Sequence, residues 1–329
     1  MSATLLFGLS PAALLLVVGA LAFGVLSGSN DGGTLVSLVT RTSVVSPGAA
    51  LGILALIVTL GPLVLGGAVA TTVAHRLVSF DQSGGRLVLV AAVAAAMLVV
   101  FVLLRKGLST SLTLALIGGI VGAGIGDGLH VAWVTVGGVL GMGLAAPLVS
   151  VAVAYGMTRA LSLLPATWWV RRRGRALQWA GFLAQSVAYS ANDAQKMVAL
   201  LAIGAQADAQ DVSPHWGTQL ALGACFALGV VLGVRRLTGR LGERVLPVRP
   251  ANAVVLELSA SAVVLASSAL GAPISSTQAA TTALVGTGLG SGSHRLRWNE
   301  VANVAMAWAL TLPLSIAAGS VLGLAVRGL

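Results

Sequence analysis

Long apolar blocks are the feature of this sequence that most restricts its fold. A helix that crosses a bilayer needs about 20 apolar residues. Blocks of about that length or longer occupy residues 5–26, 49–74, 87–104, 131–164, 217–234, 251–270 and 301–326. Charged residues make up only 9% of the chain, whereas about 25% is usual for soluble proteins. The sequence therefore predicts an all-α polytopic membrane protein, with the lipid bilayer around its helices.

The chain is also basic, with a formal net charge of +10. Nucleic-acid binding is one explanation of such a charge, but aromatic residues are few and no basic segment belongs to a soluble domain. We therefore expect no nucleic-acid partner. Lys and Arg collect in cytoplasmic loops of membrane proteins. With the connection at residues 165–176 on the inside, twelve loop arginines fall inside and three outside. This distribution predicts a cytoplasmic-membrane protein with both termini outside.

Two polar motifs occur twice within the apolar blocks. Ser-Asn-Asp at 29–31 recurs as Ala-Asn-Asp at 191–193, 162 positions later. A Gly-Ser/Thr motif at 107–113 recurs at 271–277, 164 positions later. Two unrelated motifs with nearly one offset predict an internal repeat. The first repeat spans residues 1–164, a basic cytoplasmic connection spans 165–176, and the second repeat spans 177–329.

Each repeat has the same expected series of elements. A helix interrupted at Asn-Asp is followed by one span, by two apolar segments joined at the Gly-Ser/Thr motif, and by a final span. If the joined segments form a re-entrant hairpin, each half crosses the membrane an odd number of times. The second repeat is then inverted relative to the first, as in many secondary transporters. Residues 87–126 leave a second possibility of two full spans, because Arg105 and Lys106 would otherwise lie at a hairpin tip deep in the membrane.

Three acidic residues lie well inside apolar segments: Asp31, Asp193 and Glu257. An unpaired charge in hydrocarbon costs at least a few kcal/mol. Mutual pairing is the structural alternative, but the symmetric placement of the two aspartates favours a function. We expect these acids to carry a coupling cation or proton, and Lys196 to be a charge partner that neutralises an acid or attracts an anion. Neighbouring Gly and Asn residues disfavour continuous helix and predict unwinding there.

Hydroxyl side chains follow the second motif of each repeat, at Ser111 and Thr113 and at Ser275, Ser276 and Thr277. Each cluster begins an apolar helix, where hydroxyl and backbone donors converge without a fixed positive charge. Such a site suits reversible binding of a tetrahedral oxyanion. Hydrogen bonding of these hydroxyls to their own helix is the alternative explanation. The repetition of the cluster favours binding.

At these motifs the sequence resembles the inorganic phosphate transporter (PiT) family. The second repeat is the closer match, with Ala-Asn-Asp-Ala-Gln-Lys at 191–196, Leu-Glu-Leu-Ser-Ala at 256–260 and Gly-Ala-Pro-Ile-Ser-Ser-Thr-Gln at 271–278. The resemblance covers nearly the whole chain. It implies import of inorganic phosphate by alternating access, driven by a proton or sodium gradient, and it suggests a homodimer. The expected substrate contacts are Asn30, Ser111, Thr113, Asn192, Ser275, Ser276 and Thr277.

The sequence departs from the family pattern at several positions. Tyr189 stands where His is usual, Leu114 and Gln278 replace the His that closes each hydroxyl motif, and Thr71 stands where animal members have a second glutamate. With that acid absent, proton coupling is a candidate beside sodium coupling.

Other functions remain as alternatives. The closest alternative is a sulfate permease of the same fold, since the same hydroxyl groups fit sulfate and phosphate. A carboxylate acceptor in the site favours phosphate, because phosphate can donate a hydrogen bond and sulfate cannot. A channel would differ by the lack of gradient-driven accumulation. An enzyme is not expected, because the four histidines have no metal-binding spacing. We also expect no cofactor and no structural metal.

Overall fold

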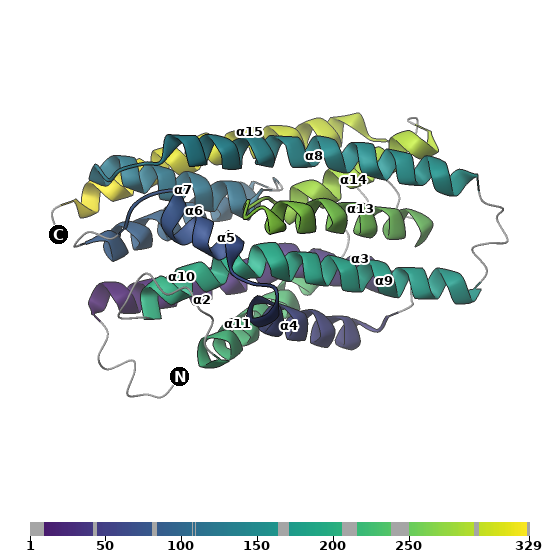
Figure 1. The fold of residues 1–329 in the computed structure, drawn as a ribbon, viewed down its shortest axis with the longest axis horizontal. Helices are drawn as coiled ribbons and strands as arrows, with labels where there is room; N and C mark the ends of the chain where they lie inside the picture. Colours follow the sequence, from purple (N-terminus) through teal and green to yellow (C-terminus); the bar gives the residue numbers. More distant parts are fainter. Residues whose placement is uncertain are drawn as a thin grey trace.

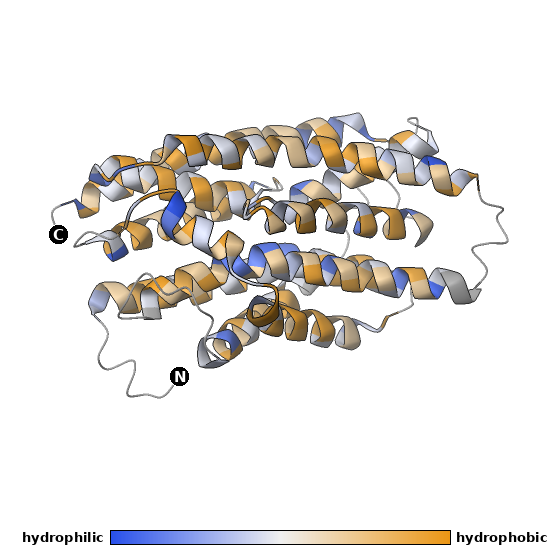
Figure 2. Cartoon of the chain, in the orientation of Figure 1, coloured by the Kyte–Doolittle hydropathy of each residue, from blue (hydrophilic) through white to orange (hydrophobic). Residues whose placement is uncertain are grey.

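The computed structural model describes residues 10–41, 45–80, 84–106, 108, 110–163, 171–205, 216–237, 250–292 and 296–327. Within these residues the chain is helical, apart from connecting segments and one isolated bridge between Val78 and Val131. Seven of the described helices are long and apolar enough to cross a membrane. Figure 2 shows the helices mostly in hydrophobic colours, as expected for lipid-facing surfaces. The predicted all-α membrane fold is confirmed.

The long helices, the π-helical turns at the Asn-Asp motifs and the hairpins occur in the same order in both halves of the described chain. The first half consists of α2 (Pro11–Ser27), the π-helical turn η1 (Gly28–Gly32), α3 (Gly33–Arg41), α4 (Pro47–Val64), α5 (Ala68–Thr71), η2 (Thr72–Arg76), α6 (Gly85–Arg105), α7 (Leu112–Asp127) and α8 (Trp133–Ser162). The second consists of α9 (Arg171–Tyr189), η4 (Ser190–Ala194), α10 (Gln195–Ala205), α11 (Trp216–Leu237), α13 (Pro250–Ala269), α14 (Ser276–Ser291) and α15 (Trp298–Val326). Helix α9 begins at Arg171, six residues before the predicted start of the second repeat, and residues 164–170 lie outside the described part.

The two hairpins enter the molecule from opposite ends. Figure 1 shows α6 and α7 at one end and α13 and α14 at the other, with both turns near the middle, while α8 and α15 run along the whole length. Helices α6 and α7 thus form a hairpin that turns back near the middle of the molecule, as a re-entrant segment would, although α6 alone is long and apolar enough to cross a membrane. Helix α7 packs against α15, and α14 packs against α8. Each hairpin thus packs against the final helix of the other half, which interlocks the two halves.

The tip of the first hairpin carries exposed positive charge. Arg105 ends α6, and both Arg105 and Lys106 have exposed side chains. The Arg105 guanidinium lies 4.7 Å from the centre of the Phe101 ring. Because a charge facing hydrocarbon is costly, this tip requires water or another polar surface beside it.

The two Asn-Asp motifs interrupt their helices in an unexpected form. The predicted unwinding is wrong, because the chain stays helical and forms a five-residue π-helical turn at each motif. A π-helical turn widens the helix locally and is frequent at functional sites. It also keeps the backbone hydrogen-bonded inside the helix, which a membrane requires. The polar residues of the α9–η4–α10 rod gather at its middle (Figure 2).

Glycines allow a close crossing between α11 and the first π-helical turn. A Cβ atom on Gly28 would meet the backbone carbonyl of Phe226, and one on Gly229 would meet the carbonyl of Val25. Small residues permit such backbone contacts between helices in membranes. The crossing therefore holds η1, with its Asn-Asp motif, in a fixed position.

This crossing predicts the effect of one added methyl group. Gly229→Ala forces α11 away from α2, and overpacking of this kind costs about 1–3 kcal/mol. We expect a lower melting temperature for the purified protein in detergent. Gly52→Ala is the matched control, because a Cβ there meets nothing within 4 Å. Equal melting temperatures of the two variants would contradict the crossing.

Candidate functional site

The hydroxyl motifs begin the inner helix of each hairpin. Ser111 is the N-cap of α7, and its hydroxyl oxygen accepts a hydrogen bond from the Leu114 N–H at 3.2 Å. Ser275 caps α14 in the same way, accepting from the Gln278 N–H at 3.3 Å. Both serines are thus bound to their own helix, but as caps of its N-terminus. The positive ends of both helix dipoles lie at the hairpin turns, near the middle of the molecule (Figure 1).

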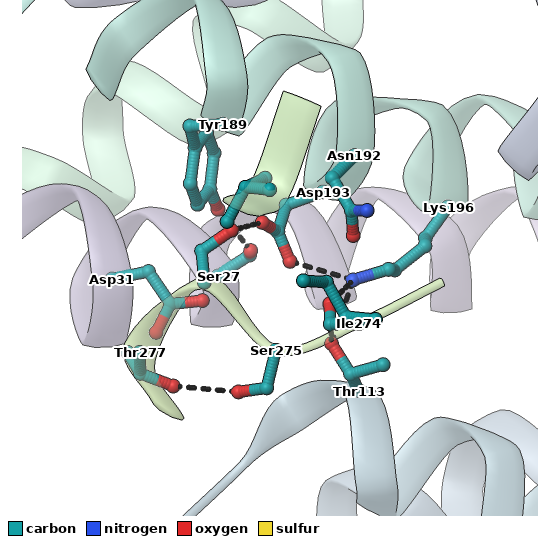
Figure 3. A network of polar contacts seen from close by, with 12 residues as sticks. Ser27, Asp31, Thr113, Tyr189, Asn192, Asp193, Lys196, Ile274, Ser275 and Thr277 are labelled. Carbon is teal, nitrogen blue, oxygen red and sulfur yellow. Dashed lines mark hydrogen bonds and ion pairs between the residues drawn. The ribbon is translucent and has the colours of Figure 1, made fainter. Parts of the chain in front are cut away.

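Lys196 joins the second rod to both hairpins. Its side chain is 2% exposed, and its ammonium donates hydrogen bonds to Asp193 Oδ1 at 2.8 Å, Thr113 Oγ1 at 2.6 Å and the Ile274 carbonyl at 2.6 Å. The Ser276 hydroxyl donates to the other oxygen of Asp193. Figure 3 shows these groups converging on the lysine. Lys196 and Asp193 form an ion pair, with the ammonium nitrogen 2.8 Å from the carboxylate.

Asp31 lies at the same centre, on the η1 turn between α2 and α3 of the first half. The Asn30 amide donates to its carboxylate at 2.7 Å, and no other side chain in the described residues bonds to it. A cavity separates Asp31 from α14 and is also lined by Thr34, Gln185, Tyr189, Ser276 and Thr277. Lys196 forms its salt bridge with Asp193, so Asp31 faces this cavity without a salt bridge of its own among the described residues.

Tyr189 and Ser27 mark the place where the two halves meet. Their hydroxyl groups are 2.5 Å apart, and the residues are separated by 162 positions, the offset of the Asn-Asp motifs. Corresponding residues of two repeats can contact each other only near the axis that relates the repeats. The cavity beside Tyr189 therefore lies close to this axis, between the two halves.

The two asparagines have structural partners. The Asn30 amide is bound to Asp31. The Asn192 amide donates to Ser268 Oγ at 3.0 Å and to the Ala272 carbonyl at 3.2 Å, which attaches η4 to the second hairpin. The Asn192 amide oxygen is buried without a partner. Neither asparagine lines the cavity.

Glu257 lies apart from the central network. It is 3% exposed on α13 and packs against Gly181 of α9, where an added Cβ would contact its carboxylate. No described side chain donates a hydrogen bond to it. One turn further along α13, the Ser261 hydroxyl is 2.9 Å from Gln185 Oε1, which connects this helix to the cavity wall.

The groups in the site that could bind a cation are the carboxylates of Asp31 and Asp193 and the hydroxyl and carbonyl oxygens beside them. The described residues contain no group of three or more His, Cys, Asp or Glu side chains that could hold a metal ion. The structure brings Asp31, Asp193, Lys196, Thr113, Ser276 and Thr277 to one centre and leaves Glu257 outside it.

Sequence reasoning did not place Thr34, Gln185 or Thr281 in the site. All three line the cavity. Their helical spacing from the motifs was the available signal, since residues three or four apart share a helix face. Thr34 lies three positions after Asp31, Thr281 lies four after Thr277, and Gln185 lies two turns before Asp193.

Comparisons with known proteins agree with the family resemblance of the sequence motifs. Residues 27–319 match the model of the phosphate transporter family. A probable low-affinity inorganic phosphate transporter of Mycobacterium bovis is 30% identical over 321 residues, covering 92% of this chain and 74% of the relative. One from Bacillus subtilis is 25% identical, with coverage of 94% and 95%. A solved structure of a sodium-dependent phosphate transporter has a TM-score of 0.80 at 17% identity, covering 95% of this chain and 98% of that one.

The contact between the halves gives a prediction about stability. Tyr189→Phe removes the hydrogen bond to Ser27, and the loss of one buried hydrogen bond costs about 0.5–1.5 kcal/mol. We expect a lower melting temperature in detergent. Tyr155→Phe makes the same chemical change at a side chain that is 45% exposed and should have no effect. If Tyr189→Phe is as stable as Tyr155→Phe, the hydroxyl pair does not hold the halves together.

Proposed function

Because the chain belongs to the phosphate transporter family, we propose that it imports inorganic phosphate across the cytoplasmic membrane as a secondary transporter. Membership of a family of transporters also means that the protein is not an enzyme. The observation that carries the proposal is the cavity between the two halves, with hydroxyl groups on one side and Asp31 on the other.

The cavity chemistry suits a tetrahedral oxyanion. Thr277 and Ser276 lie at the start of α14, where the helix dipole favours a negative charge. Ser275 is bonded to Thr277 at 2.9 Å and belongs to the same cluster. Asp31 supplies an acceptor for the hydroxyl of a phosphate ion, which sulfate cannot match. This acceptor, together with the named function of the relatives, supports phosphate over the alternative of sulfate.

The remaining proposed substrate contacts are engaged with protein groups. Thr113 is bound to Lys196 and to the Ile274 carbonyl, Ser111 caps α7, and both asparagine amides have partners. These residues can reach phosphate only if those partners are exchanged during transport. Ser276 and Thr277 are the proposed contacts that line the cavity. The Ser276 hydroxyl would have to exchange its bond to Asp193, and Ser275 its role as the cap of α14, before either could bind phosphate.

Coupling follows from the charge on Asp31. A buried carboxylate beside an incoming anion is unfavourable unless a cation or proton accompanies it. We propose that Asp31 carries the coupling proton or sodium ion. Asp193 is a weaker candidate because Lys196 already neutralises it. Glu257 is a separate carrier candidate, since it is buried with no described partner.

The interlocked halves support alternating access. Two inverted repeats that meet at one central site can rock against each other and open the site to either side. From the distribution of basic residues among the loops we infer that both termini lie outside, and the family resemblance suggests a homodimer.

Neutralising Asp31 tests the coupling. In proteoliposomes, we expect Asp31→Asn to lose gradient-driven phosphate accumulation by at least about tenfold, because one ionic interaction at the site is worth more than about 1.4 kcal/mol. Exchange of phosphate across the membrane should be retained, since it needs no net cation movement. Asp127→Asn, the same change at the end of α7, is the control and should accumulate phosphate normally.

The same assay identifies substrate and coupling ion. Radiolabelled phosphate should accumulate under an imposed proton or sodium gradient, and radiolabelled sulfate should not. If Asp31→Asn still accumulates phosphate, Asp31 does not carry the coupling ion. If sulfate is taken up in preference to phosphate, the proposed substrate is wrong.

A further inference from the structure

The oxygens around Lys196 are of the kinds that bind a small monovalent cation. Its ammonium is held by a carboxylate oxygen, a hydroxyl oxygen and a main-chain carbonyl, all at 2.6–2.8 Å. These oxygens come from η4, α7 and the turn before α14. Carboxylate and carbonyl oxygens are the usual ligands of hard cations, and such groups at half-helix ends hold coupling ions in transporters with inverted repeats. In this chain the positive charge at that position belongs to a side chain.

The corresponding position in the first half has no such side chain. The offsets of 162 and 164 relate Asp193 to Asp31, Lys196 to Thr34 and Thr113 to Thr277. Asp31, Thr34 and Thr277 all line the cavity. Asp31, Thr34 and Thr277 thus border the cavity, whereas Asp193 and Thr113, the counterparts of Asp31 and Thr277, bind the ammonium of Lys196, the counterpart of Thr34. Figure 3 shows Asp31 near Thr277, and Asp193 and Thr113 beside Lys196.

We propose that the Lys196 ammonium is a built-in cation, which occupies in the second half the position that a mobile cation would otherwise take. This inference rests on the proposed function, because it concerns the cations that accompany transport. A tethered charge stays with the protein through the cycle. The protein therefore needs a mobile cation or proton only on the Asp31 side, and Lys196 positions both hairpins by holding Thr113 and the turn at Ile274.

The proposal predicts that shortening this side chain creates a cation site. Lys196→Thr reproduces the residue found at position 34 and leaves the Asp193, Thr113 and Ile274 oxygens without their cation. Sodium should then bind there and stabilise the folded protein by mass action. We expect the melting temperature of purified Lys196→Thr, measured without phosphate, to rise by about 2–4 °C more than that of the wild type when sodium chloride replaces choline chloride.

Two control variants separate this site from general salt effects. Lys106→Thr makes the same change at an exposed lysine on the hairpin tip, and it should respond to sodium as the wild type does. Lys196→Thr combined with Asp193→Asn removes both charges, so it should fold without sodium and lose the additional response.

The outcomes distinguish this proposal from the proposed function. If Lys196→Thr responds to sodium no more than the wild type, or fails to fold with sodium present, the oxygens do not form a cation site and the proposal is overturned. A failure of wild-type phosphate uptake would instead count against the proposed function, and it would leave the melting measurement unaffected. In transport, Lys196→Thr should need one more sodium ion per phosphate, seen as a rise of about one in the Hill coefficient for sodium.

Discussion

A carboxylate buried among membrane helices needs a counter-charge, and the centre of this protein is organised by how that charge is supplied. Asp193 has a permanent partner in Lys196, which also holds the starts of two helices from opposite halves. Asp31 has an amide partner but forms no salt bridge among the described residues. This difference between two equivalent acids leaves one aspartate of the central network paired and the other unpaired. The unpaired acid is the one that faces the cavity.

The framework serves this centre by bringing distant segments to one point. The π-helical turns place each aspartate midway along its rod, and the hairpins bring two helix N-termini to the same depth (Figure 1). Packing of each hairpin against the long helix of the other half means that neither half forms the site alone. The glycine crossing at η1 and the Ser27–Tyr189 contact fix how the halves fit. Transport by relative movement of the halves would therefore change the site directly.

Much of this arrangement could be predicted from the sequence. The apolar blocks determined the membrane fold, and the shared offset of the Asn-Asp and hydroxyl motifs indicated the repeated order of elements. The form of the interruption could not be predicted, because glycine and asparagine disfavour regular helix without specifying whether the chain unwinds or forms a π-helical turn. The partners of Asn192 and the separation of Glu257 from the network depend on tertiary packing. Thr34 and Gln185 share a helix face with the motif aspartates, so helical spacing alone predicts their place in the cavity wall.

The central claim is that the cavity between the halves is the phosphate site, and thiol protection tests it most directly. In a background where Cys225, the single native cysteine, is replaced by Ala, Thr281→Cys places a thiol in the cavity wall. The rate at which a small thiol reagent modifies this cysteine is measured with and without phosphate. The comparison is the wild-type protein, in which the reagent modifies the native Cys225 on α11. The account predicts that phosphate slows modification at position 281, that equal sulfate does not, and that Cys225 is unaffected. An unchanged rate at position 281, in a variant that still takes up phosphate, would contradict it.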